Sequence, residues 1–309
     1  MTAVKETRTD GPVLLELVRE AKISELLGDT HGKRYEASGV HFEDGYLYVI
    51  FDDAPHILRL RPDWSTGEEA PTLIETHVSA SGYEDITYQP FEKRWYCLIE
   101  ASETGSGGFK PRIDEFDASF RFMESHWLDF PVKRENKGIE GLSYLRYRDE
   151  NYILGLCEGN ACKSGSAGRE PGHGRIQVFR RTAGDWQHTG TIKLPSSVLF
   201  EDYASLDVRN RYVTVISQVS SAMWVGRVRS DPAGLDDLFE DEGRTFRFPR
   251  NRDDRIIYCN VEGVTWLPDR RLVVVSDKAK SDEQSSRCRK KDQSIHIFKL
   301  PARDGQPDS

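Results

Sequence analysis

The sequence predicts an all-β protein, a five-bladed β-propeller with four-stranded blades. Two observations predict it. Short apolar runs rich in Val, Ile, Leu and Tyr recur along all 309 residues and are separated by Gly, Pro, Asp and Asn clusters, a pattern typical of strands and turns. Five of these runs open with a related phrase, and self-similarity at a fixed long period is typical of propellers and other repeat folds. Helices are expected to be short, at 20–27 or 232–239 at most.

The five phrases predict the first strand of each blade. They are YEASGVHF (35–42), YEDITY (83–88), IEGLSY (139–144), YASLDV (203–208) and VEGVTW (261–266). Second strands are expected at 47–51, 95–99, 152–157, 213–217 and 272–276, and third strands at 56–60, 112–116, 175–179, 223–228 and 294–298. Outer strands are expected at 72–77, 121–128, 188–194 and 245–248. Blades therefore begin near residues 36, 82, 138, 203 and 260.

The fifth unit ends without an outer strand of its own. The apolar segment at 12–18, PVLLELV, can supply it, and a strand from the N-terminus would close the ring and protect its edges. This predicts one domain over residues 1–309 with a tail at 301–309. A β-sandwich or two small β domains would also show short strands, but neither needs a matching acidic or hydroxyl residue at the start of each unit.

The repeated phrases also predict a metal site. First strands line the channel of a propeller, so equivalent positions form a ring about its axis. The ring consists of Ser38, Glu84, Glu140, Ser205 and Glu262. Converging carboxylates repel one another and lose solvation, so they take up a proton or a cation. Three carboxylates and two hydroxyls favour calcium over zinc, which prefers His and Cys. The alternative is a water-filled channel without metal.

The ends of the second strands predict a rim of polar residues at one face. They are Asp52, Asp53, Glu100, Glu158, Gln218, Asp277 and Lys278. Carboxylates there could orient a water molecule while a lysine neutralises a developing anion, which makes Asp53, Glu100, Glu158, Asp277 and Lys278 the candidate catalytic residues. The alternative is an ordinary polar loop face, because strand ends are commonly acidic.

Three long loops follow second strands, at 101–112, 160–175 and 278–291, and each contains Lys and Arg. They suggest that this face receives a small anionic molecule. The loop at 160–175 is either a mobile lid over that ligand or a disordered insertion.

Charge and composition exclude other classes of function. The net charge is −8, which disfavours a nucleic-acid binder. No apolar run approaches the roughly 18 residues of a membrane span, and the polar start MTAVKETRTD does not resemble an export signal, so a cytoplasmic location is expected. The five cysteines form no C-x-x-C pair, and reduced, buried thiols are expected rather than disulfides or a zinc site.

The order Ser, Glu, Glu, Ser, Glu at successive blade starts resembles the axial calcium site of the calcium-activated nucleotidases of the apyrase family, which are five-bladed propellers. The segment EASGVHFEDGYLYVIFDD (36–53) resembles the first blade of that family and VEGV its last. The phrases EASGV and IEGLSY also resemble phytase-like and SdiA-regulated propellers. The resemblance touches all five blades through short phrases. Family apyrases are secretory-pathway proteins, and the loop at 160–174 matches no nucleotide-binding segment of theirs.

Together these observations favour a calcium-containing propeller hydrolase acting on a small anionic substrate, a phosphate ester or anhydride. A non-catalytic propeller that binds a ligand or a protein, with a purely structural axial ion, is the alternative. The fold alone does not decide between the two.

Overall fold

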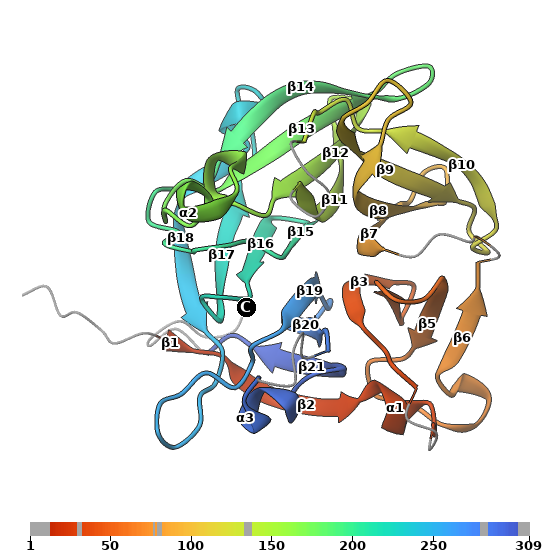
Figure 1. The fold of residues 1–309 in the computed structure, drawn as a ribbon, viewed down its shortest axis with the longest axis vertical. Helices are drawn as coiled ribbons and strands as arrows, with labels where there is room; N and C mark the ends of the chain where they lie inside the picture. Colours follow the sequence, from red (N-terminus) through yellow and green to blue (C-terminus); the bar gives the residue numbers. More distant parts are fainter. Residues whose placement is uncertain are drawn as a thin grey trace, which may run out of the picture.

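Five β-sheets stand in a ring around a common axis in the computed structural model, which describes residues 13–29, 33–76, 78, 82–132, 138–278 and 284–301 (Figure 1). Each sheet is a four-stranded antiparallel blade, and one blade carries an additional short strand. The prediction of a five-bladed propeller is therefore confirmed.

The blades follow the chain in order. Blade 1 consists of β3 (Ala37–Glu43), β4 (Tyr46–Phe51), β5 (His56–Leu60) and β6 (Thr72–Glu75). Blade 2 consists of β7 (Tyr83–Gln89), β8 (Arg94–Glu103), β9 (Phe109–Phe116) and β10 (Phe122–Trp127). Blade 3 consists of β11 (Ile139–Tyr147), β12 (Glu150–Cys157), β13 (Arg175–Arg181) and β14 (Trp186–Lys193). Blade 4 consists of β15 (Ser205–Arg209), β16 (Tyr212–Ser217), β17 (Ala222–Val228) and β18 (Phe239–Arg247).

Blade 5 is closed by the N-terminal segment, as predicted, but with different residues. Its strands are β19 (Val261–Trp266), β20 (Arg271–Ser276), β21 (Ser294–Lys299) and β2 (Glu16–Lys22), and β2 runs antiparallel to β21. The predicted segment 12–18 is only partly right, because β1 (Val13–Leu14) pairs in parallel with β18 of blade 4. The chain crosses between blades at the buried Leu15. An outer strand is half solvated, so the polar residues after Val18 can complete the blade.

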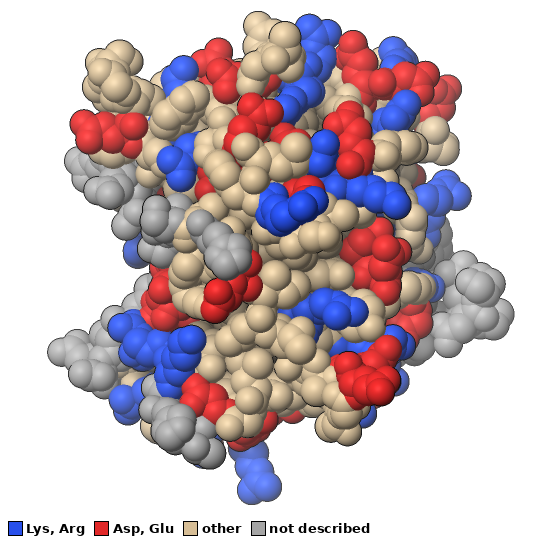
Figure 2. Space-filling model, turned by 90° about the vertical axis from the view of Figure 1, so that its right-hand side faces the viewer, with Lys and Arg blue, Asp and Glu red and all other residues tan. Residues whose placement is uncertain are grey.

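The helices are single turns. They are α1 (Ile23–Leu26), α2 (Gly165–Gly168) and α3 (Ser286–Arg289), with 3-10 turns at η1 (Gly67–Glu69), η2 (Asn160–Cys162) and η3 (Leu235–Asp237). Among the described residues, no helix has the length and apolar character needed to cross a bilayer. On the side of the ring shown in Figure 2, Lys and Arg are interspersed with Asp and Glu, as expected of solvated outer strands.

The hydrophobic core lies between blades and is divided into five clusters, one at each seam. At the seam between blades 3 and 4, for example, Leu154 and Leu156 of β12 pack with Val213 and Val215 of β16. At the seam that closes the ring, Val49 of blade 1 packs in one cluster with residues of blade 5. Apolar side chains follow one another along the second strands, as in Leu272–Val275 of β20, because both faces of a blade are covered by neighbours.

Glycines allow the first strands to meet at the axis. A Cβ atom on Gly39 would lie 2.8 Å from the Cα of Asp85, one on Gly141 would lie 2.8 Å from the backbone nitrogen of Leu206, and one on Gly263 would lie 2.8 Å from the Cα of Gly39. A side chain does not fit at these three positions. The glycines therefore form a layer in which neighbouring blades touch through their backbones.

A ladder of hydrogen bonds joins the first strands one layer below the glycines. In four of the five blades a polar side chain accepts the backbone N–H of the next blade. The pairs are Thr87 with Tyr144, Ser143 with Val208, Asp207 with Trp266, and Thr265 with Phe42. Buried N–H groups that lack a partner within their own sheet are satisfied in this way, and the first strands of neighbouring blades stay in a fixed mutual register.

Candidate metal and catalytic centre

Four of the five first strands carry a β-bulge close to their start. The register shifts fall between Ala37 and Gly39, Tyr83 and Ile86, Ile139 and Gly141, and Val261 and Gly263. A bulge leaves its extra residue outside the ladder and re-aims its side chain. The residues inside these shifts include Ser38, Glu84, Glu140 and Glu262, which are four of the five predicted ring members.

The fifth predicted ring member, Ser205, lies at a different level. Ser205 pairs with Ile216 in blade 4, as Gly263 pairs with Val275 in blade 5, so the register aligns Ser205 with the glycine layer. Its hydroxyl donates a hydrogen bond to Oδ2 of Asp85 at 3.0 Å and accepts the N–H of Val264 at 3.2 Å. The structure therefore gives Ser205 a place in the contact between blades, one residue beyond the bulges.

The predicted metal ring and the predicted catalytic rim meet in one group of glutamates, which we call the axial glutamate cluster: Glu84, Glu100, Glu140, Glu158 and Glu262. Carboxylate oxygens of Glu100, Glu140 and Glu158 lie within 4.8 Å of one another. Burial, followed by the charges of the other four glutamates, raises the pKa of Glu140 well above its usual range. A cation or a proton is needed to offset this repulsion.

Backbone groups and one amide hold the cluster. Oε1 of Glu100 accepts the N–H of Gly138 at 2.6 Å, and Nε2 of Gln218 donates to Oε1 of Glu262 at 2.5 Å. The backbone of Glu158 bridges two blades, since its N–H donates to the carbonyl of Gly138 at 3.2 Å and its carbonyl accepts the N–H of Tyr203 at 2.9 Å. Three strand ends are thereby fixed around the axis before any ligand binds.

The remaining predicted residues make hydrogen bonds outside the cluster, Ser38 to the neighbouring blade and the others within their own blades. The hydroxyl of Ser38 donates to the carbonyl of Tyr83. Oδ1 of the exposed Asp53 accepts the N–H of Glu36 at 3.2 Å. Asp277 is buried, and its carboxylate accepts the N–H of Lys278, whose own side chain is half-buried. The charges that raise the pKa of Glu140, after burial, come from Glu100, Glu84, Glu158 and Glu262.

Sequence analysis missed one carboxylate beside the cluster, Asp202. Its Oδ1 accepts the hydroxyl of Ser217 at 2.5 Å and the N–H of Val219 at 3.1 Å. Burial raises the pKa of Asp202, and the charge of Glu158 raises it by a smaller amount. Blade 4 has Ala204 where the other blades have an acidic or hydroxyl residue, and the acidic residue lies two positions earlier in the phrase EDYAS. A search that allowed this offset would have found it.

The loop at 160–175 is an ordered part of the fold and not a disordered insertion, while a lid stays a prediction. The side chain of Asn160 is fully buried, and its Nδ2 donates to the carbonyls of Gly168 at 3.1 Å and Phe200 at 2.9 Å. Its Oδ1 accepts the N–H of His173 and the hydroxyl of Tyr203. Hydrogen bonds of this one buried amide therefore join residues of the loop to one another and to Phe200 and Tyr203. They hold the loop in place next to Glu158.

Two disulfides correct the expectation of reduced thiols. Cys157 is bonded to Cys162, and Cys259 is bonded to Cys288, while Cys97 is buried and free. The η2 turn folds the chain back on itself over five residues, and the blade 5 loop brings together cysteines 29 residues apart. Spacing rules do not anticipate either pair. Disulfides are typical of oxidising compartments, and the cytoplasmic location stays a prediction.

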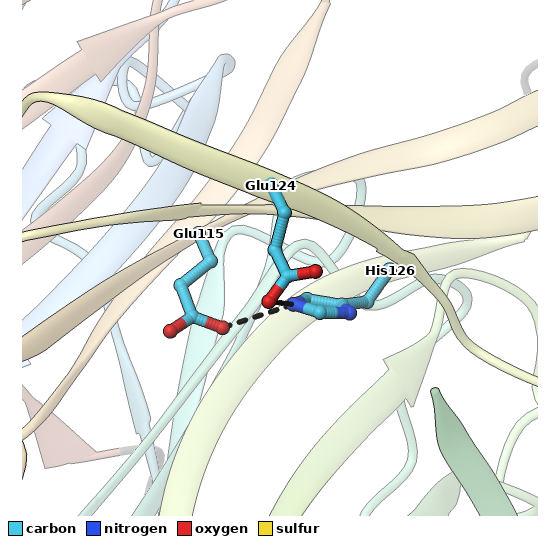
Figure 3. A group of neighbouring side chains, drawn as sticks. All are labelled: Glu115, Glu124 and His126. Atoms are coloured by element: carbon cyan, nitrogen blue, oxygen red, sulfur yellow. Dashed lines mark hydrogen bonds and ion pairs between the residues drawn. The ribbon is translucent and has the colours of Figure 1, made fainter. Parts of the chain in front are cut away.

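A second group of ionisable side chains lies at the seam between blades 2 and 3, and we call it the seam cluster: Glu115, Glu124, His126 and Arg181. Figure 3 shows Glu115 and Glu124 directed at the same edge of the His126 ring. Nε2 of His126 lies 2.9 Å from Oε2 of Glu115, and its Nδ1 lies 2.8 Å from the carbonyl of Gly184. Nη2 of Arg181 lies 3.2 Å from both Nε2 and Oε2, where a metal ion would have to sit. This group is therefore an ion-pair network joining two blades.

Comparisons with known proteins show the fold. The chain resembles the crystal structure of a GH43_1 enzyme from Xanthomonas citri at 13% identity and a TM-score of 0.53, over 94% of this chain and 93% of that one. It resembles Myxococcus xanthus glutaminyl cyclase at 11% identity and a TM-score of 0.54, over 94% and 98% of the two chains.

A third similar structure is RS223-β-xylosidase, at 10% identity and a TM-score of 0.51, over 90% of this chain and 94% of that one. Neither a scan against protein-family models nor a search of curated proteins found a match. The three structures share the propeller architecture, and none of them is a nucleotidase by name. The nucleotidase part of the resemblance stays a prediction.

Proposed function

We propose that the axial glutamate cluster binds a divalent cation, calcium by preference, and is the centre of a propeller hydrolase. The proposed substrate is a small anion, a phosphate ester or anhydride, which enters from the face where the second strands end. The observation that carries the proposal is the convergence of five glutamates from blades 2, 3 and 5, where burial and then the neighbouring charges raise the pKa of Glu140.

The donor set fits calcium. Calcium takes roughly 6–8 oxygen ligands with flexible geometry, and the cluster offers carboxylate oxygens at the bulges of three blades. Zinc sites in proteins are mostly built from His and Cys, and the three residues whose ligand atoms lie within 4.8 Å here are all glutamates. Glu84, Glu140 and Glu262 would hold the ion. Ser38 and Ser205, the other two residues of the ring predicted from the sequence, stay predicted ligands. The bound ion would supply positive charge and polarise an oxygen of the substrate.

The chain itself would then orient a water molecule and hold its proton. Glu100 lies in β8 at a shift in its pairing with β9, Glu158 directly follows β12, and both lie next to Glu140, so their carboxylates can accept a proton from water placed between them. The hydrogen bond from Gly138 fixes the carboxylate of Glu100, and the bridging backbone of Glu158 fixes its position. Lys278, at the end of blade 5, is the predicted partner of the anionic leaving group.

A glycoside hydrolase is the second candidate. Its two carboxyl groups act as an acid and a base or nucleophile, and in retaining enzymes they stand only about 5–5.5 Å apart. The oxygens of Glu100, Glu140 and Glu158 approach one another this closely, and the raised pKa of Glu140 suits a proton donor. A neutral sugar also approaches five glutamates more easily than a phosphate does. The structures of GH43 enzymes share only the fold with this chain.

The two candidates and the non-catalytic alternative separate in one experiment. Purified protein is treated with chelator, divided, and half is reloaded with calcium. Both halves are assayed on nucleoside triphosphates, p-nitrophenyl phosphate and p-nitrophenyl β-xyloside, with Glu140→Gln and Glu158→Gln alongside. Glu124→Gln is the matched control because its side chain is 62% exposed at a distant seam. Calcium-dependent phosphate release that both axial variants lose is the expected result.

Other outcomes point elsewhere. Xyloside cleavage that survives chelation would favour the glycosidase. No turnover, together with a calcium-dependent rise in melting temperature that Glu140→Gln abolishes, would leave a structural ion in a binding propeller. An identical melting temperature with calcium and with chelator in the unsubstituted protein would contradict the cation site itself.

A further inference from the structure

A groove of about 570 Å3 lies at the outer seam between blades 2 and 3. Its lining comes from three segments: the loop between β8 and β9, the end of β10, and the turn between β13 and β14. This volume is within the range of roughly 300–1,000 Å3 that small-molecule sites occupy. None of its lining residues belongs to the axial glutamate cluster, so the groove is separate from the proposed reaction centre.

The two walls of the groove are held together by hydrogen bonds between blades. The N–H of Trp127 donates to Oδ1 of Asp185 at 2.9 Å, and the N–H of Asp129 donates to the carbonyl of Trp186 at 2.9 Å. Leu128, between them, forms a bridge with Trp186. The seam cluster adds the contact between His126 and Gly184 just beside the turn. The groove is therefore preformed, and little conformational entropy would be lost from its walls when a ligand binds.

The lining combines one aromatic ring with many polar groups. The half-buried Trp127 supplies an indole, and Asp129, Asp185 and Gln187 supply carboxylates and an amide, with hydroxyls from Ser106 and Thr182. Lys110 is the one basic lining residue among those described, and its ammonium group lies 2.8 Å from Oδ1 of Asp129. The groove thus presents hydrogen-bond donors and acceptors in a mixed set, around a single flat apolar surface.

We propose that this groove binds a neutral saccharide. A sugar ring has an apolar face that packs on an indole and a rim of hydroxyls that both donate to carboxylates and accept from amides. Two carboxylates and a neutralised lysine disfavour an anionic ligand, since an anion would meet net negative charge. A purely apolar ligand would cover these solvated polar groups without offering them hydrogen bonds, at a cost for each group that it desolvates.

The groove and the axial cluster face different parts of the ring, so the two proposals stand independently. A saccharide held at the perimeter would keep the protein on a glycan or glycan-coated surface, whatever reaction the axial cluster performs. The proposal says nothing of cleavage at the groove.

The test is a binding titration by NMR with xylotriose, maltotriose and cellotriose, each added separately to the intact chain. We expect at least one of them to bind, and Trp127→Ala to weaken that binding at least about tenfold, or about 1.4 kcal/mol. Gln187→Trp is the second variant, since its exposed side chain on β14 can fill the groove without changing the hydrogen bonds of the seam. It should lose binding to the same extent.

Two controls locate the site. Phe91→Ala removes a ring that is 63% exposed elsewhere and should leave binding unchanged. Glu140→Gln should also leave it unchanged, whereas its effect on calcium binding tests the axial proposal. The inference is overturned if no trisaccharide binds, if both groove variants bind like the unsubstituted protein, if Glu140→Gln abolishes binding, or if glucose 6-phosphate displaces the neutral sugar more strongly than glucose does.

Discussion

The carboxyl group of Asp85 links three blades at the axis. It accepts the N–H of Leu142 in blade 3 at 2.8 Å, the hydroxyl of Ser205 in blade 4 at 3.0 Å, and the N–H of the following residue in its own strand at 2.9 Å. Burial raises the pKa of this carboxyl well above its usual range, although all three donors lower it. Asp85 takes the position at which blades 1, 3 and 5 have glycine.

We expect Asp85→Ala to lower the free energy of unfolding by about 3 kcal/mol or more, because it leaves three buried donors without an acceptor at about 1–3 kcal/mol each. Asp85→Asn keeps an acceptor oxygen and should cost less. Denaturant unfolding measures both, with Asp241→Ala as the control because the Asp241 side chain is 98% exposed. Equal losses for the alanine and asparagine variants would contradict this role.

His126 makes stability depend on pH. Burial lowers its pKa, but the hydrogen bond to Glu115 and the carbonyl of Gly184 raise it above its ordinary value overall. The protonated imidazole stabilises the fold fully below about pH 6.5, the pKa of an unperturbed histidine, and this contribution is lost as the pH rises through the higher pKa of the folded state.

We therefore expect the free energy of unfolding of the unsubstituted protein, taken relative to that of His126→Gln, to fall between about pH 6.5 and pH 8; the difference isolates His126 from the buried His41 and His296, whose pKa values are lowered. Urea unfolding across this range measures it. His173→Gln is the control, since the hydrogen bonds that the structure gives His173 are made by its backbone N–H and carbonyl. Parallel profiles for the unsubstituted protein and His126→Gln would show that the seam cluster does not titrate here.

At the scale of elements, the glycine layer decides how closely first strands approach. A Cβ on Gly263 would lie 2.8 Å from the Cα of Gly39 and 2.8 Å from Cγ2 of Val275, and backbone cannot yield as a flexible side chain can. We expect Gly263→Ala to cost about 1–3 kcal/mol, the usual range for overpacking. Thermal unfolding measures the loss.

Gly190 provides the control for this substitution. It lies in the outer strand β14, and a Cβ there would meet no atom within 4 Å. Gly190→Ala should leave stability within about 0.5 kcal/mol of the original, or raise it slightly. A cost as large as that of Gly263→Ala would mean that strand glycines matter for their flexibility rather than for their lack of a side chain.

Element positions could be predicted from the sequence because inner strands are buried on both faces. Their apolar runs are dense, and the second strands of all five blades lie where the pattern places them. The outer strands show a weaker pattern, since half their residues face water, and β2 was predicted at the apolar residues before it. The spacing of apolar residues indicates which segments are buried, but it does not indicate which strands pair with each other.

At the scale of the whole molecule, ring closure depends on an N-terminal strand, β2, meeting the last strand, β21, in one blade. Beyond its ladder with β21, β2 contributes the ion pair of Lys22 with Asp292 at 2.7 Å and the contact of Glu20 with His296 at 3.2 Å. Removing β2 would expose the edge of β21 to solvent and to other chains.

We expect a chain that begins at residue 23 to melt at a lower temperature and to aggregate, and a synthetic peptide covering residues 13–22 to restore the original melting temperature by adding a strand to the open edge. Calorimetry with and without the peptide measures this. A chain that begins at residue 13 is the control for truncation, and a scrambled peptide is the control for the added strand. Unchanged melting of the chain from residue 23 would contradict closure by β2.

The sequence by itself determined the number of blades, the order of strands and the repeat of Glu84, Glu140 and Glu262. The spacing of apolar residues and the repeated phrase are both local features, which can be recognised within a few consecutive residues. Only the tertiary structure decided that Glu100 and Glu158 join these three in one cluster, that Ser205 lies at the glycine layer, and which cysteines pair. These features depend on distances between segments far apart in the sequence. Such distances are set by bulges, strand register and twist, which cannot be recognised from the sequence alone.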